Sequence, residues 1–279
     1  MLKILVACEE SQTVCKAFRE LGHEAYSCDM VEPSGGHPEW HVKGDALALI
    51  GADASFFTMD GKHHVIDRWD LIVAHPPCTY LSNAGACRLY PSKGNIDENR
   101  YKKGMKAKEF FMRFYDADCD HICIENPIPS KVFELPEYTQ TIQPYEYGHP
   151  YSKKTCLWLR GLPSLTPTEV LDVYKPYVSC GTSRNKGNPD KAGFSRAGGA
   201  AKIRSKTFSG VAKAMAEQWS AYIEGRYDMS PTDEIVKIHI FIEDWEIEKL
   251  RSITGKALQS EIELERAVEH YLLDCLDMA

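Results

Sequence analysis

Two reactive side chains stand beside short apolar runs of this 279-residue chain. Cys78 follows the apolar run 71–74 after a pair of prolines, and Glu125 directly follows the run 122–124. A cysteine on a rigid turn can act as a nucleophile, and a carboxylate can hold or protonate a ring nitrogen. Together the two residues suggest covalent chemistry on a pyrimidine.

The two runs belong to an alternation of short apolar segments and helical patterns, which is typical of βαβ units and a mostly parallel sheet. Strands are expected at 3–7, 24–28, 41–43, 69–74, 121–125, 141–145 and 155–159. The last two should form an antiparallel pair. Because the carboxyl ends of parallel strands share one edge of a sheet, both reactive side chains should lie at that edge.

Helical patterns flank these strands. The first helix is expected over 11–21, with Ser11 as its N-cap. Further helices are expected at about 97–117 and 207–224. The predicted fold class is therefore α/β, with a mixed seven-stranded Rossmann-like sheet flanked by helices.

The composition excludes several classes of protein. Hydrophobic residues make up 43% of the chain, which is enough for a large core. No stretch reaches the ~18 apolar residues that a membrane helix needs, so no membrane partner is expected. Residues 1–7 have neither the length nor the cleavage site of a signal peptide and indicate a first strand. We therefore expect a cytoplasmic protein.

The ten cysteines are scattered and form no Cys-x-x-Cys pair, which argues against a disulfide framework. Cys119 and Cys123, with a histidine between them, could be drawn as a metal site. This segment enters a predicted buried strand, however. We therefore interpret both cysteines as buried thiols and expect no bound metal.

The net charge of −7 is concentrated at the end of the chain. Residues 229–279 hold 12 acidic and 5 basic residues, so the remainder is neutral overall. A strand and two acidic amphipathic helices are expected there. The sequence thus predicts a domain over 1–228 and an acidic α+β appendage over 229–279. The appendage is a candidate docking piece for a protein partner or for self-association.

Residues 161–206 are rich in Gly, Pro, Ser and Lys, which predicts a small inserted lobe or target-recognition loop. Within it, 184–206 carries seven basic residues against one acidic residue, Asp190. A basic segment beside a cleft is what contacts with phosphate require. DNA is therefore an expected partner.

Three short motifs follow one another in an order that carries a family resemblance. They are Asp70-x4-His75-Pro76-Pro77-Cys78 with Ser82 after it, Glu125-Asn126-Pro127, and Tyr147-Gly148-His149-Pro150 leading into a strand. With these motifs the chain resembles the cytosine-5 DNA methyltransferases, especially short phage or prophage members. The resemblance covers about 3–163 and 203–221. It implies an S-adenosylmethionine-dependent methyltransferase in a bacterial or phage-infected cell.

The resemblance implies a role for each reactive residue. The Cys78 thiolate would add to carbon-6 of a flipped-out cytosine, and Glu125 would contact the ring nitrogen and the exocyclic amine. Carbon-5 would then take a methyl group from S-adenosylmethionine, and loss of its proton would expel the cysteine. The alternatives are that Cys78 is a turn residue without chemistry and that Glu125 is a helix-cap or salt-bridge acid.

The cofactor would lie across the carboxyl ends of the first four strands. Asp29 could accept hydrogen bonds from ribose hydroxyls, and Asp45 could contact the adenine amine. Their ordinary interpretations are a turn aspartate and the N-cap of a helix starting at Ala46. The other expected cofactor contacts are Ala7, Cys8, Glu9 and Pro76. The expected substrate or DNA contacts are Ser82, Asn126, Lys153, Lys154, Arg184, Lys186 and Arg196.

The chain departs from the family in its first loop, in a pair of basic residues and in a very short target-recognition region. Its first loop, 7–12, has no glycine, and Lys153 and Thr155 stand where the family has a pair of arginines. One alternative is therefore a catalytically silent module that keeps the fold for nucleic-acid or protein binding. An amino-methyltransferase is less favoured, because His75 precedes and Cys78 follows the prolines. A papain-like thiol hydrolase would need a histidine beside Cys78.

Overall fold

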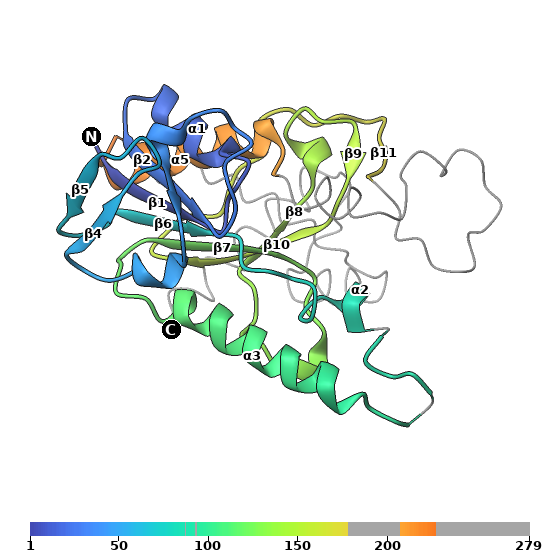
Figure 1. Cartoon of the computed structure of the whole chain (residues 1–279). Coiled ribbons are helices and arrows are strands. Elements are labelled where there is room, and N and C mark those ends of the chain that lie inside the picture. The colour runs from blue at the N-terminus through green and yellow to red at the C-terminus, as the bar shows by residue number, and fades with distance from the viewer. Residues whose placement is uncertain (87, 93, 178–206, 227–279) are drawn as a thin grey trace, which may run out of the picture. The chain divides into compact units, whose positions relative to one another are not determined.

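The computed structural model of this protein describes residues 1–86, 88–92, 94–177 and 207–226 (Figure 1). They belong to the first of two units of the chain, Met1–Asp228. The predicted appendage, 229–279, lies outside the described residues. So does the basic part of the predicted lobe, with Arg184, Lys186 and Arg196.

The main sheet of the described chain has seven strands in the order β3-β2-β1-β6-β7-β10-β8. Their bounds are β1 Lys3–Ala7, β2 Glu24–Asp29, β3 His41–Lys43, β6 Leu71–Ala74, β7 Ile122–Pro127, β8 Gln140–Ile142 and β10 Thr155–Arg160. The strands from β3 to β7 in this order are parallel, whereas β10 runs antiparallel to both of its neighbours. The expected mixed Rossmann-like sheet is therefore confirmed.

Helices cover both faces of this sheet, with α3 on one face and α1 and α5 on the other (Figure 1). The α-helices are α1 Thr13–Glu20, α2 Asn83–Ala86, α3 Glu98–Tyr115 and α5 Ser209–Ile223. The short 3₁₀ helices are η1 Pro38–Trp40, η2 Ala46–Ala48, η3 Lys131–Phe133 and η4 Pro144–Glu146. The three long predicted helices are all present, with ends that differ by a few residues.

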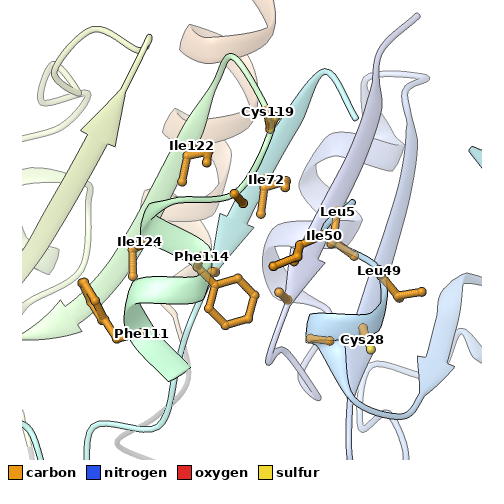
Figure 2. Close-up of a cluster of buried hydrophobic side chains, with 14 of the residues drawn as sticks. Leu5, Cys28, Leu49, Ile50, Ile72, Phe111, Phe114, Cys119, Ile122 and Ile124 are labelled. Atoms are coloured by element: carbon orange, nitrogen blue, oxygen red, sulfur yellow. The ribbon is translucent and has the colours of Figure 1, made fainter. Parts of the chain in front are cut away.

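Successive side chains of the central strands point to opposite faces of the sheet. In β1, Leu5 packs in the cluster that α3 covers with Phe111 and Phe114, as Figure 2 shows. Its neighbours Ile4 and Val6 pack on the other face with residues of α1 and α5. Burial on both faces explains why these strands are continuous apolar runs in the sequence.

The prediction misses two small sheets. One is an antiparallel hairpin of β4 (Ala54–Phe57) and β5 (His63–Ile66), and the other pairs β9 (Tyr151–Ser152) with β11 (Lys175–Pro176) in parallel. The hairpin strands alternate buried and exposed residues over only four positions, which is a weak sequence signal. The other pair joins two-residue segments that are distant in the sequence, so no local pattern identifies it.

Helix α1 does not begin as predicted, because Ser11 is not its N-cap. The residue before the helix is Gln12, which has a left-handed backbone conformation with φ of 58° and makes no side-chain cap. The first-turn amides of Val14 and Cys15 instead donate to the carboxylate of Glu9, at 2.7 and 3.1 Å. The chain turns sharply between Glu9 and the helix. The Glu9 carboxylate therefore caps the first turn in place of a side chain at the N-cap position.

The described thiols of the suspected metal segment are buried. Cys119 is 3% exposed and Cys123 is fully buried, and the Cys119 thiol donates to the carbonyl of Trp69 at 3.3 Å. Both therefore pack as small apolar side chains. Within the described ranges, no helix has the length and apolar character to cross a membrane.

Candidate active site

The loop that follows β6 is bonded to the last residues of β7 at the carboxyl edge of the sheet. His75 is the first residue after β6, and its Nδ1 lies 2.9 Å from Oε2 of Glu125 on β7. The next residue of β7, Asn126, donates from Nδ2 to the carbonyl of Pro76 at 2.9 Å. These two bonds hold the prolyl turn that carries Cys78 against the end of β7.

Cys78 begins a tight turn in its loop. Its carbonyl oxygen accepts hydrogen bonds from the amides of Leu81 and Ser82, at 3.1 and 2.9 Å, and the residue is partly exposed. Ser82 is buried, and its hydroxyl accepts from the amide of Gly85 in α2 at 3.2 Å. Ser82 therefore supports the turn of Cys78, and its expected contact with the substrate stays a prediction.

Glu125 is a buried carboxylate in cationic surroundings, with a side chain that is 10% exposed. Its Oε2 also accepts a hydrogen bond from Thr207 Oγ1 at 2.9 Å. Burial alone raises the pKa of a carboxyl group, but the hydrogen bond from His75 and the charge of Lys153 lower the pKa of Glu125 to about 2. Glu125 is therefore ionised at neutral pH, and Lys153 acts on it electrostatically.

Two carboxylates raise the pKa of His75. Burial lowers the pKa of its ring, but the hydrogen bond and charge of Glu125, together with the charge of Glu9, raise the pKa above its ordinary value. Nε2 of His75 and Oδ1 of Asn126 are buried and have no hydrogen-bond partner in the part of the chain that the structure describes. Leaving such an atom unpaired costs about 1–3 kcal/mol, so each of the two atoms has the capacity for one more hydrogen bond.

Thr207 and Phe208 reach the site from the start of α5, and sequence reasoning missed both. The ring centroid of Phe208 lies 5.9 Å from Lys153 Nζ, and both residues line a cavity of about 10 Å³ next to Glu125. This space holds no more than one water molecule and is too small for a pyrimidine ring. Lys154, the other lysine predicted to contact the substrate, is exposed on the same turn.

The expected cofactor contacts gather at the carboxyl ends of β1 and β2. Burial raises the pKa of the Cys8 thiol, and the charges of Asp29 and Asp45 raise it further, because the three side chains are neighbours. Asp29 is partly exposed, and its Oδ1 accepts from the amide of Val31 at 3.1 Å. Asp45 accepts from the amide of Leu47 at 3.0 Å and is the N-cap of η2, as its ordinary interpretation predicts. Asp29 therefore offers a carboxylate that a ligand can reach.

Glu9 occupies the position that a ligand anion would take at the start of α1. Its carboxylate is 4% exposed and accepts from both first-turn amides, so a second anion cannot use them at the same time. Burial raises the pKa of Glu9, while the charge of His75 and the hydrogen bonds lower it, and the net shift is upward. Ala7, which ends β1, is buried, and its carbonyl accepts from the His75 amide at 2.9 Å.

These residues fit a cofactor that carries ribose hydroxyls and a positive charge. The carboxylate of Asp29 can accept hydrogen bonds from the hydroxyls, and Glu9 and Asp45 make the surroundings negative. A carboxylate of the cofactor could not bind at the start of α1, because the Glu9 carboxylate already accepts the hydrogen bonds of the amides there. Pro76, the remaining expected contact, uses its carbonyl to accept from Asn126.

A larger hollow, of about 650 Å³, lies at the opposite end of the strands. Its lining includes Met1, Arg19, Glu20, His23, Glu24 and Trp40. These residues border the amino ends of β1 and β2, whereas ligands of open α/β sheets bind beyond the carboxyl ends. We therefore place the candidate site at the carboxyl edge, where the loop of Cys78 is bonded to the end of β7, although the cavity there is smaller.

No protein-family model and no curated protein matches this chain. Two crystal structures of Dnmt2 proteins are among the similar solved structures. A mutant of Spodoptera frugiperda DNMT2 is 17% identical, with a TM-score of 0.29, and the match covers 64% of this chain and 56% of that one. The S. pombe Dnmt2 methyltransferase is 12% identical, with a TM-score of 0.27, and the match covers 59% of this chain and 50% of that one. The chain thus spans about half the length of these structures.

Proposed function

We propose that this protein is an S-adenosylmethionine-dependent methyltransferase that acts on carbon-5 of cytosine in DNA through a covalent adduct with Cys78. The observation that carries the proposal is the double connection between the loop after β6 and the end of β7. One bond joins His75 to Glu125, and the other joins Asn126 to Pro76. Together they hold the turn of a nucleophile against a carboxylate that can hold a base.

Cys78 would supply the nucleophile as a thiolate. Its sulfur forms a bond to carbon-6, and the electron pair of the 5,6 double bond becomes available at carbon-5. The ionised carboxylate of Glu125 would accept a hydrogen bond from the exocyclic amine and so orient the ring. Once carbon-5 carries the methyl group, loss of its proton to water re-forms the double bond and expels the thiolate.

S-Adenosylmethionine supplies an electrophilic methyl group when it is bound. Asp29 would accept hydrogen bonds from its ribose, and Glu9 would lie near its positive charge. Because the amides at the start of α1 are occupied by Glu9, the carboxylate of the cofactor must be held elsewhere. This arrangement accounts for a first loop that is acidic and has no glycine.

DNA is the proposed substrate because the described residues on both sides of the stretch that contains the basic segment 184–206 lie beside the site. The chain leaves the described region after Tyr177 and returns at Thr207, which bonds to Glu125. The rings of Tyr177 and Phe208 lie 4.8 Å apart, so the two ends are neighbours. The target base must leave the stack, because a thiolate cannot reach carbon-6 inside a duplex.

One observation favours a second candidate function. The self-capping of α1 by Glu9 removes two amides that could hold a cofactor anion, as expected if the chain were a silent nucleic-acid or protein-binding module. Isothermal titration with S-adenosylmethionine separates the two functions. A silent module gives no heat of binding at high cofactor concentration, whereas the enzyme binds.

Mass spectrometry of nucleosides from DNA that was co-expressed with the protein tests the activity itself. We expect 5-methylcytosine above the level of a host that carries an empty vector and lacks its own cytosine methyltransferases. Methylated adenine or N4-methylcytosine would instead indicate an amino-methyltransferase. DNA without any added methyl group, from cells in which the protein is soluble and abundant, would contradict the proposal.

A further inference from the structure

We propose that His75 is a positioning residue that holds the Glu125 carboxylate and carries the proton that the pyrimidine ring takes up when Cys78 adds. This inference rests on the proposed function and deepens it. It concerns a buried side chain that precedes the prolyl turn and to which the pattern of reactive residues assigns no role.

The position of His75 is determined by three neighbouring strands. Ala74 pairs with Ile124 in the parallel register, so His75 lies beside Glu125 where β6 and β7 end. Its amide donates to the carbonyl of Ala7 on β1 at 2.9 Å, and its Nδ1 lies 2.9 Å from Glu125 Oε2. The side chains of the pair are 11% and 10% exposed. A ring fixed in this way can present only Nδ1 to the carboxylate.

Charged groups from every neighbouring element act on the ring. Glu125 from β7 and Glu9 from the turn after β1 favour the protonated ring, whereas Lys153 from the turn before β10 opposes it. The balance raises the pKa of His75 while the pKa of Glu125 falls to about 2. The proton of the pair is therefore located on the imidazole and not on the carboxylate.

This distribution determines how a proton can reach the base. When the Cys78 sulfur bonds to carbon-6, negative charge develops on the ring and its nitrogen-3 becomes basic. Glu125 then passes a proton from His75 Nδ1 to nitrogen-3, which leaves His75 neutral and Glu125 ionised again. When the thiolate leaves, the proton returns by the same path. Glu125 alone could not supply this proton, because its pKa of about 2 leaves it ionised at neutral pH.

The protonation state of His75 can be measured without any turnover. Nitrogen-15 NMR of the ring in wild-type protein should show a pKa above the ordinary histidine value, and the Glu125→Gln variant should titrate at a lower pH. Lys153→Gln is the matched control, because removal of an opposing charge should move the titration to a higher pH. A wild-type ring that is neutral at pH 6, or one that Glu125→Gln leaves unchanged, overturns the inference.

The second measurement uses activity. In His75→Asn the amide Nδ2 can still donate to Glu125 but carries no titratable proton. We expect kcat to fall by about a hundredfold, the lower end of what general acid–base groups contribute, with little change in KM. The alkaline decline of kcat in the wild-type enzyme should also disappear. An unchanged kcat and pH profile in His75→Asn overturns the inference alone, whereas a wild-type protein that neither methylates nor traps DNA overturns the proposed function with it.

Discussion

Nδ1 of His75 and Oε2 of Glu125 lie 2.9 Å apart although the two residues are 50 positions apart in the sequence. The contact exists because β6 and β7 are adjacent parallel strands, so that the residues at their carboxyl ends are neighbours. It joins the loop of the proposed nucleophile to the carboxylate that would hold the base.

Replacement of the proposed nucleophile should abolish methyl transfer without unfolding the protein. Cys78→Ser keeps a side chain of similar size, but a hydroxyl near neutral pH is a far poorer nucleophile than a thiolate. DNA that contains 5-fluorocytosine should form a covalent adduct with wild-type protein and none with the variant. Thr79→Ser, an exposed change in the same turn, serves as the control and should trap normally. Substantial turnover by Cys78→Ser would rule out the covalent mechanism.

The ion pair should make stability depend on pH in two directions. The lowered pKa of Glu125 means that its contribution is complete above the ordinary carboxyl pKa of 4.5 and is lost as the pH falls toward about 2. The raised pKa of His75 means that its contribution is complete below its ordinary pKa of 6.5 and is lost as the pH rises through the higher value in the folded protein. The pair should therefore stabilise the protein most between these two ordinary values.

Denaturant unfolding of Glu125→Gln checks this dependence. Removal of one partner of a buried pair should lower the free energy of unfolding by about 3 kcal/mol near pH 5.5. The difference from wild type should shrink below pH 4, where the wild-type carboxylate begins to lose its advantage. Glu109→Gln, on the exposed side of α3, should change the stability little at any pH. A constant difference between Glu125→Gln and wild type from pH 3 to pH 8 would contradict the ion pair.

Glu9 should stabilise the start of α1 mainly by accepting hydrogen bonds and less by its negative charge. Glu9→Ala leaves the amides of Val14 and Cys15 without their acceptor and should lower the free energy of unfolding by about 1–2 kcal/mol, as loss of a helix cap does. Glu9→Gln removes a buried charge whose pKa is raised by burial but keeps only one of the two acceptor oxygens, so its loss of stability at pH 7 should be smaller than that of Glu9→Ala. Equal losses in the two variants, measured by chemical denaturation, would show that the charge itself stabilises α1.

Asp29 should contribute to cofactor affinity and little to the fold. Its carboxylate is partly exposed and accepts a hydrogen bond from the amide of Val31. Asp29→Asn keeps that acceptor and weakens the charged hydrogen bonds to ribose, so S-adenosylmethionine should bind about tenfold more weakly. Isothermal titration measures the affinity, with the exposed Asp118→Asn as control. Wild-type affinity in Asp29→Asn would remove Asp29 from the cofactor site.

The basic segment should bind phosphate without reading sequence. Charge reversal at Arg184, Lys186 and Arg196 should weaken DNA binding for all sequences and flatten its dependence on salt, while specificity barely changes. Binding is to be measured against salt with and without residues 229–279, because that acidic stretch could compete with DNA. An unchanged salt slope in the triple variant would leave the segment without a role in nucleic-acid binding.

The main features of the fold followed from local sequence patterns. Apolar runs at 71–74 and 122–124 predicted buried strands because a strand covered on both faces needs apolar side chains at every position. The alternation of strands and helices then placed Cys78 and Glu125 at one edge of the sheet. The hairpin Ala54–Ile66 was missed, since its four-residue strands carry too little periodicity to separate them from a loop.

The sequence by itself determined which residues are available for chemistry and on which strands they lie, because strand order and side-chain type are local properties. Only the tertiary structure decided their partners. It brought Thr207 to Glu125 across 82 positions, placed the Glu9 carboxylate at the amides of α1, and raised the pKa of His75. Such contacts depend on backbone turns and on the packing of distant segments, which leave no periodic signal in the sequence. The charge state of the site is therefore a property of the folded chain.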